Sequence, residues 1–301
     1  MLQRQSVLET PRVRELKRQR KTSKKRKILL WTIGVLLFLS LLIFLSHIKQ
    51  MRINTILISG NTVVKTDQIL AKSQESLFGN YLYAFSKQNF LLYPRRAIER
   101  NLLSSLKRLQ TVQVTLQDVH TLRIVVSERE GRYLWCGHSF DETVGDTPDA
   151  ECYYLDAAGY IFSKSPYFSG NVYLKFFGTG LFSETLDPVG RQYLPIEEFT
   201  SVRDFSDGLA KLGIDIYAVY IRGNGDYDLY ISSLEPGRPV YTKIRFNKKG
   251  DSATLLKNLR AALETEPFKS DFKAKFNDLM YIDLRFTNKV LYMFKPTTVE
   301  F

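Results

Sequence analysis

The sequence predicts a membrane-anchored α+β protein in which one N-terminal transmembrane helix is followed by two folded domains. Three observations support this fold class: the basic residues crowd at the N-terminus, an uncharged apolar segment follows them, and the rest of the chain alternates helical and strand patterns. Strand patterns dominate toward the C-terminus. We therefore expect a small mixed domain first and a β-rich domain with flanking helices second.

The positive charge of the chain is concentrated in its first 27 residues. This segment holds eleven Lys or Arg against Glu9 and Glu15, a net charge of +9 out of +12, so the other 274 residues carry only +3. A nucleic-acid-binding domain places its basic groups on folded surface to neutralise phosphates. We therefore expect residues 1–27 to be a basic cytoplasmic tail, and we expect no nucleic-acid partner.

Residues 28–48 form the predicted transmembrane helix. These 21 residues carry no formal charge and no polar face, and as a helix they span roughly 31 Å, close to the bilayer core of about 30 Å. Cations stay on the cytoplasmic side, and only Lys49, Arg52 and Lys65 follow the segment closely. We expect an uncleaved single-pass anchor in the cytoplasmic membrane, with the N-terminus cytoplasmic and the later domains outside.

The first domain is predicted at residues 51–130. Its order is a strand at 53–58, helices beginning near Asp67 and Pro94, and strands at 112–116 and 122–126. Thr66 is the expected N-cap of the first helix, and Pro94 suits the first turn of the second. This β-α-α-β-β order predicts a three-stranded sheet with both helices on one face.

The second domain is predicted at residues 131–296, with a short tail at 297–301. The Asp156-x-x-Gly159 turn should close a hairpin, since Gly supplies the positive φ that such turns need. The remaining elements are a helix at 197–212, strands at 214–221, 227–231 and 240–246, a helix at 252–263, and strands at 279–286 and 290–294 turned at 287–289. This pattern predicts a β-rich domain with flanking helices.

Four segments, in order along the chain, resemble the FtsQ/DivIB cell-division family. They are Ile53–Asn61 with the pattern I-x-x-I-x-I-x-G-N, LRIVVSERE at 122–130, the Asp156 hairpin, and YIDLRF at 281–286. In that family the first domain is a POTRA domain. The turn at 118–121 departs from the family, which usually has a proline there.

The resemblance implies a non-enzymatic bitopic scaffold of the divisome, located at the division septum. Such a protein binds FtsB/DivIC-like and FtsL-like membrane proteins outside the cytoplasmic membrane, without a cofactor or a small-molecule substrate. In the family, the C-terminal strands of the β-rich domain receive these partners. The resemblance therefore implies the following candidate partner-binding residues: Tyr281, Asp283, Arg285, Phe286, Tyr292 and Phe294. The alternative is that they are ordinary strand residues, with Asp283 and Arg285 forming a surface ion pair of little energetic value.

Cys136 and Cys152 are the two cysteines of the chain. An oxidising exterior permits a disulfide between them, and two separately buried thiols are the alternative. With His138 they supply three zinc ligands, but no fourth ligand is spaced with them. We therefore expect no metal site.

The sequence leaves two other classes of protein as alternatives. Ser104-x-x-Lys107, Ser169-Gly170-Asn171 and Lys248-Lys249-Gly250 follow the order of penicillin-binding motifs. Ser104, however, lies late in an amphipathic helix rather than at the start of a helix facing a cleft, so we expect no catalytic residues. A POTRA-containing envelope assembly or secretion component is the second alternative, but such proteins carry a long barrel of amphipathic strands that the sequence does not show.

Overall fold

The computed structural model describes residues 11–141, 151–168, 172–182, 186–231, 242–286 and 288–296. The chain divides into two compact units, Met1–Leu102 with Thr111–Val126 and Leu103–Gln110 with Ser127–Phe301. Residues 103–110 and 127–130 thus group with the second unit, although the sequence places them in the first domain. Residues 1–10 of the predicted N-terminal tail and the whole predicted C-terminal tail, 297–301, lie outside the described residues.

The first unit begins with the long helix α1 (Pro11–Ser46). Its part from Lys24 to Ser46 is 23 residues long, and its most apolar stretch has no buried residue. A core helix of this hydrophobicity would be covered by protein, whereas here side chains such as Trp31 and Phe44 are exposed. The helix is long and apolar enough to cross a bilayer, which suggests single-pass anchoring.

A three-stranded sheet with order β1-β5-β4 is the centre of the first unit. The bounds of its elements are β1 (Thr55–Ser59), α2 (Thr66–Leu77), β2 (Asn80–Tyr81), β3 (Phe85–Ser86), α3 (Arg95–Ser105), β4 (Leu109–Leu116) and β5 (Thr121–Glu128). Alternate residues of β5 are buried, including Leu122 and Ile124, and the helices contribute Ile69, Ile98 and Leu102 to the same core. The predicted α+β fold of this region is confirmed.

Two local details differ from expectation. Helix α2 begins at Thr66 itself, its N-cap position is Lys65, and no side chain caps it. The Thr66 hydroxyl instead accepts a hydrogen bond from Asn61 Nδ2 at 3.1 Å, which fixes the turn after β1. The sequence also gave no sign of the short β2–β3 hairpin between the helices, because two-residue strands have no measurable periodicity.

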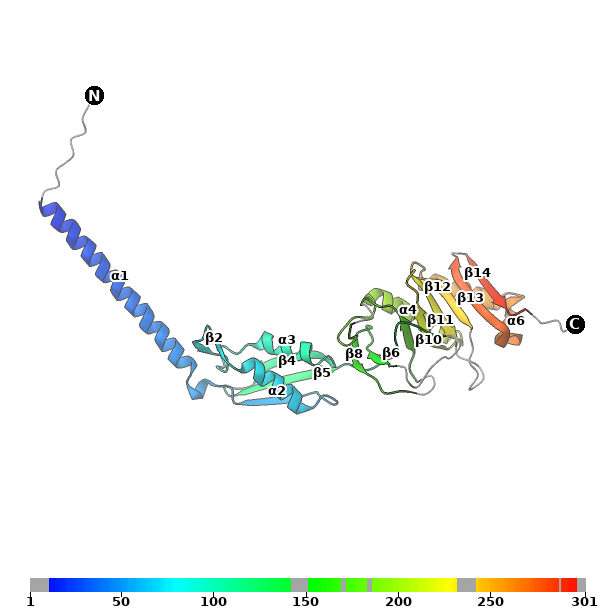
Figure 1. The fold of residues 1–301 in the computed structure, drawn as a ribbon, viewed down its shortest axis with the longest axis horizontal. Helices are drawn as coiled ribbons and strands as arrows, with labels where there is room; N and C mark the ends of the chain where they lie inside the picture. The colour runs from blue at the N-terminus through cyan, green and yellow to red at the C-terminus, as the bar shows by residue number, and fades with distance from the viewer. Residues whose placement is uncertain are drawn as a thin grey trace, which may run out of the picture. The chain divides into compact units, whose positions relative to one another are not determined.

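The second unit is built on a nine-stranded sheet with order β14-β13-β12-β11-β10-β9-β6-β7-β8 (Figure 1). Its strands are β6 (Tyr133–Trp135), β7 (Tyr153–Leu155), β8 (Ile161–Lys164), β9 (Lys175–Gly178), β10 (Ile216–Ile221), β11 (Asp226–Ile231), β12 (Lys243–Asn247), β13 (Leu279–Phe286) and β14 (Lys289–Phe294). The predicted β-rich domain is confirmed, and most pairs are antiparallel. Parallel pairs join β9 to β6 and β10, and β12 to β13.

One face of this sheet carries the main core. Helices α4 (Ile196–Lys211), α5 (Ser252–Glu264) and α6 (Phe268–Ala274) pack against it, through residues such as Phe199, Phe205 and Leu259. Asp251 caps α5 by accepting a hydrogen bond from Thr254 N at 2.9 Å. Helix α6 is absent from the sequence expectation, since its seven residues are too few to show a helical period.

The opposite face of the sheet has two zones. From β6 through β9 and β10 to Tyr230 of β11 it carries a second apolar cluster, which includes Phe177 and the bonded pair Cys136 and Cys152. Across β10 to β13 it carries paired charges. This charged zone leads to the sheet edge at β14, where the candidate site lies.

Candidate functional site

The candidate partner-binding residues lie on β13 and β14, at one edge of the large sheet. Among the strands that the structure describes, β14 is the last in the order and pairs with β13 alone. The backbone groups on its outer side therefore have no strand partner in the described part of the chain. An edge of this kind is the geometry that accepts an added strand.

The register divides the candidate residues between two faces. Tyr281 lies opposite Met293, and Asp283 lies opposite Leu291. These residues share the charged face, because Asp283 is also paired with Arg245 of β12. The turn residue Thr287 lies outside the described residues.

Tyr292 and Phe294 point to the helical face instead. Ile282, which lies opposite Tyr292, is fully buried in the main core. The ring of Tyr292 stacks on Phe268 of α6 with a centroid distance of 4.0 Å, and Phe294 packs against the same core. Both side chains are half-buried against the helices that cover this face of the sheet. We therefore restrict the candidate contact surface to the opposite, charged face of β13 and β14.

Asp283 and Arg285 are paired, but not as an exposed surface pair. Arg285 Nη2 donates to Asp283 Oδ2 at 2.6 Å, and its Nη1 donates to Asp226 Oδ2 at 3.0 Å. The Asp283 side chain is only 9% exposed. Arg285 therefore ties β13 to β11 across the intervening strand, which an isolated surface pair would not do.

A third carboxylate extends this arrangement toward the sheet centre. Asp228, fully buried, accepts hydrogen bonds at 2.6 Å from Nε of both Arg222 and Arg245. Three carboxylates thus face three guanidinium groups, and the charges balance. Buried carboxylates need this compensation because water no longer solvates them.

The ion pairs shift the acid–base behaviour of the site. Burial alone raises the pKa of Asp283, but hydrogen bonds from the Arg285 side chain and backbone outweigh it, so the pKa lies below its ordinary value. The pKa of Asp226 is lowered in the same way: burial opposes the shift, while Asn247 and Arg285 donate to the carboxylate. The hydrogen bond to Asp283 raises the pKa of Arg285. All three groups are charged at neutral pH.

Two exposed apolar side chains at this edge, Leu291 and Met293, are not among the candidate residues predicted from the sequence, whereas Phe286 is. Leu291 and Met293 are 45% and 47% exposed on the charged face of β14, and Phe286 is exposed at the end of β13. The pattern of Val290–Phe294 indicates that Leu291 and Met293 share one face of the strand, because they alternate with the aromatic residues Tyr292 and Phe294. Without the helices, the sequence could not show which of the two sets faces solvent.

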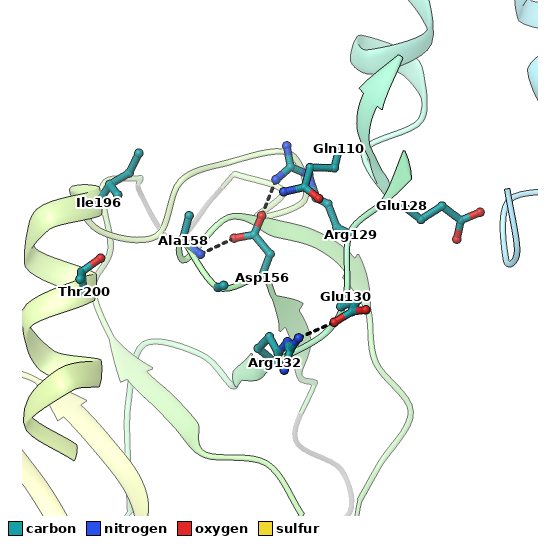
Figure 2. Close-up of a pocket in the computed structure, with 10 residues that line it drawn as sticks. Gln110, Glu128, Arg129, Glu130, Arg132, Asp156, Ala158, Ile196 and Thr200 are labelled. Carbon is teal, nitrogen blue, oxygen red and sulfur yellow. Dashed lines mark hydrogen bonds and ion pairs between the residues drawn. The ribbon is translucent and has the colours of Figure 1, made fainter. Parts of the chain in front are cut away.

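A hollow of about 390 Å³ lies beside the Asp156 turn of the second unit. Figure 2 shows two pairs of its charged residues directed at one another, Arg129 with Asp156 and Arg132 with Glu130. Arg129 pairs with Asp156, and Arg132 donates to Glu130 at 2.6 Å. Asp156 Oδ1 also accepts from Ala158 N at 2.9 Å, which holds the predicted turn. These charges are used within the fold, so this hollow is a weaker site candidate than the sheet edge.

The residues considered for catalysis or metal binding are placed as follows. Ser104 is exposed in the last turn of α3, and Lys107 lies beyond the helix end. The Ser169–Asn171 motif is outside the described residues. Cys136 and Cys152 are bonded to each other, and the described residues contain no group of three His, Cys, Asp or Glu arranged to hold a metal.

The folds of the two units define the class: an α+β protein with a membrane-length N-terminal helix and a β-rich sheet domain. Within the described residues, the last strand of that sheet, β14, has no partner on its outer side. Residues 51–129 match the family model described as POTRA domain, FtsQ-type. The chain therefore contains an FtsQ-type POTRA domain, and its resemblance to POTRA-containing proteins of the FtsQ/DivIB family is confirmed. The comparison with curated proteins returned no match.

Proposed function

We propose that this protein is a non-enzymatic, single-pass scaffold of the bacterial divisome. It binds FtsB/DivIC-like and FtsL-like membrane proteins outside the cytoplasmic membrane during septum formation. The FtsQ-type POTRA domain at residues 51–129 is the observation that carries this proposal. The apolar helix that precedes the domain supports it, and the cations before that helix favour a cytoplasmic N-terminus.

The partner site of this proposal is the outer edge of β14. A partner strand added there gains backbone hydrogen bonds, and alternate side chains give selectivity. Leu291 and Met293 provide apolar contact on one face of the added strand. Tyr281, beside Met293 in the register, extends that contact onto β13.

A direct test avoids Arg285, because its replacement breaks the tie between β11 and β13. Loss of binding by an Arg285 variant would therefore not separate a contact from a folding defect. Leu291→Asp with Met293→Asp changes side chains that are about half exposed. Leu186→Asp is the matched control, since Leu186 is 44% exposed in the same unit but lies in the loop before α4.

In the test, each full-length variant is purified from its host in mild detergent, and the co-purified FtsB/DivIC-like and FtsL-like proteins are quantified. We expect the β14 double variant to lose at least tenfold of the partner, because a carboxylate in an apolar contact costs more than about 1.4 kcal/mol. The Leu186 variant should recover the unsubstituted amount. Equal recovery by all three chains would show that the partner binds elsewhere.

A further inference from the structure

The β2–β3 hairpin of the first unit exposes large apolar side chains at its tip. Leu82 is 88% exposed and Tyr83 is fully exposed. They lie in the tight turn between the strands, where Ala84 N donates to Tyr81 O at 2.9 Å. Nothing in the described part of the chain covers the tip, so burial within the fold does not explain these residues.

The backbone conformation at the tip is also one that Leu and Tyr rarely adopt. Leu82 and Tyr83 have φ values of 47° and 60°, in the left-handed region that favours Gly and Asn. Bulky residues pay a conformational cost there, and such outliers gather at functional positions. The sequence therefore keeps two large side chains where a small residue would fold more easily.

The base of the same hairpin contacts the end of the apolar helix. Ser86 N lies 3.5 Å from Ser46 Oγ, and Asn89 Nδ2 donates to Ser46 O at 3.3 Å. Figure 1 shows β2 beside the C-terminal end of α1. Tyr83 is three residues from Ser86, so its backbone lies within about 10 Å of that contact.

The neighbouring side chains have the composition of a membrane interface. Phe78 and Leu91, which flank the hairpin, are mostly exposed. Lys87 places its ammonium group 5.6 Å from the ring centroid of Tyr81. Tyr rings and Lys side chains are enriched at the level of lipid headgroups, where an apolar body and a polar tip are both satisfied.

We propose that the β2–β3 hairpin is a second membrane contact, with Leu82 and Tyr83 inserted into the phospholipid interface of the bilayer that α1 crosses. The hairpin and the hydrogen bonds of Ser46 then hold the first unit in one orientation at the membrane surface. The inference depends on α1 spanning a bilayer. It does not depend on the role in division.

The test measures the depth of single spin labels on the full-length chain in phosphatidylcholine–phosphatidylglycerol nanodiscs. Labels are attached to Tyr83→Cys, to Val63→Cys and to Leu36→Cys. Val63 is an exposed apolar residue that follows the C-terminal end of β1, whereas α1 precedes the N-terminal end of this strand. Leu36 is in the middle of the apolar helix. The unsubstituted chain, treated with the same reagent, gives the background from Cys136 and Cys152.

We expect the label at position 83 to collide more with oxygen than with a water-soluble nickel complex, as the label at position 36 should. The label at position 63 should show the reverse. Equal nickel access at positions 83 and 63, with position 36 in lipid, would overturn the hairpin contact. Spin–spin broadening at position 83 would also overturn it, because a second copy of the chain would then cover the tip.

A pair of substitutions separates membrane contact from a structural role. Leu82→Asn with Tyr83→Asn suits the left-handed backbone, so we expect the thermal midpoint of the full-length chain in detergent to stay constant or rise. In nanodiscs, a label at Phe78→Cys should become more accessible to nickel in this background. A fall in the midpoint, or unchanged access at position 78, would contradict the proposal.

Discussion

Asp283 shows how one side chain couples strand pairing to charge. Its carboxylate is buried at the sheet edge, where desolvation would favour the neutral form, but Arg285 donates to both oxygens. The pKa is therefore lower in the folded than in the unfolded chain. A carboxylate with a lowered folded pKa stabilises the fold above its unfolded pKa, and this stabilisation is lost as the pH falls through the folded value.

This sign gives a prediction for the pH dependence of stability. At pH 7, Asp283→Asn should lower the free energy of unfolding by roughly 1 to 3 kcal/mol, because a charged partner of Arg285 is lost. As the pH falls below the ordinary value of 3.8, the unsubstituted chain loses the same contribution. The difference between the two chains, measured by urea denaturation in detergent, should therefore shrink.

Glu264→Gln is the control for this measurement. Glu264 pairs with Arg260 on the exposed surface of α5, and pairs of this kind contribute little to stability. Its unfolding curve should follow that of the unsubstituted chain at every pH. A constant gap between the Asp283→Asn and unsubstituted chains down to pH 2 would contradict the assigned shift.

At the scale of elements, hydrophobic periodicity predicted the long pieces and failed for the short ones. Helices α4 and α5 and strands β13 and β14 were found from their spacing, because each is long enough to show a period. The pairs β2–β3 and the strands β6 and β9 are two to four residues long. Their position depends on neighbours distant in sequence, which local patterns do not contain.

The candidate site illustrates the same limit. The sequence motif pointed to β13 and β14, which lie at one edge of the sheet. It could not distinguish Tyr292, which stacks on α6, from Leu291, which faces solvent. Aromatic residues are favoured both in cores and at interfaces, so residue type alone did not decide. The contact of Tyr292 with α6 determines which face of β14 is covered, and the sequence did not predict α6.

The Cys136–Cys152 link gives a prediction at this scale. The structure bonds the two residues across a separation of 16 positions, and closing a loop of this length stabilises by about 3 kcal/mol in the chain-entropy model. The double variant Cys136→Ser, Cys152→Ser should unfold more easily by about that amount. A reductant should destabilise the unsubstituted chain and leave the variant unchanged.

Mass spectrometry under non-reducing conditions provides the independent check. We expect a cross-linked peptide containing Cys136 and Cys152, and no alkylated free thiol. Recovery of both residues in alkylated form would exclude the bond and favour two separate buried thiols.

At the scale of the whole molecule, the uneven distribution of charge is explained by membrane orientation. Three quarters of the net charge lies in the first 27 residues, on the N-terminal side of the uncharged apolar segment that begins at Ile28. In our account this charge orients the chain, and the ligand-binding capacity lies elsewhere. In the proposed function, the POTRA domain and the β-rich unit lie outside the membrane, where partners with single membrane spans can reach β14.

The most direct test of the central claim is the position of a full-length fluorescent fusion in dividing cells of the host. A division scaffold should gather in a band at midcell, and the band should appear with constriction. The Leu186→Asp fusion should behave identically. A uniform signal around the envelope in constricting cells, from a fusion that supports normal growth, would contradict the role in division and favour a general envelope function.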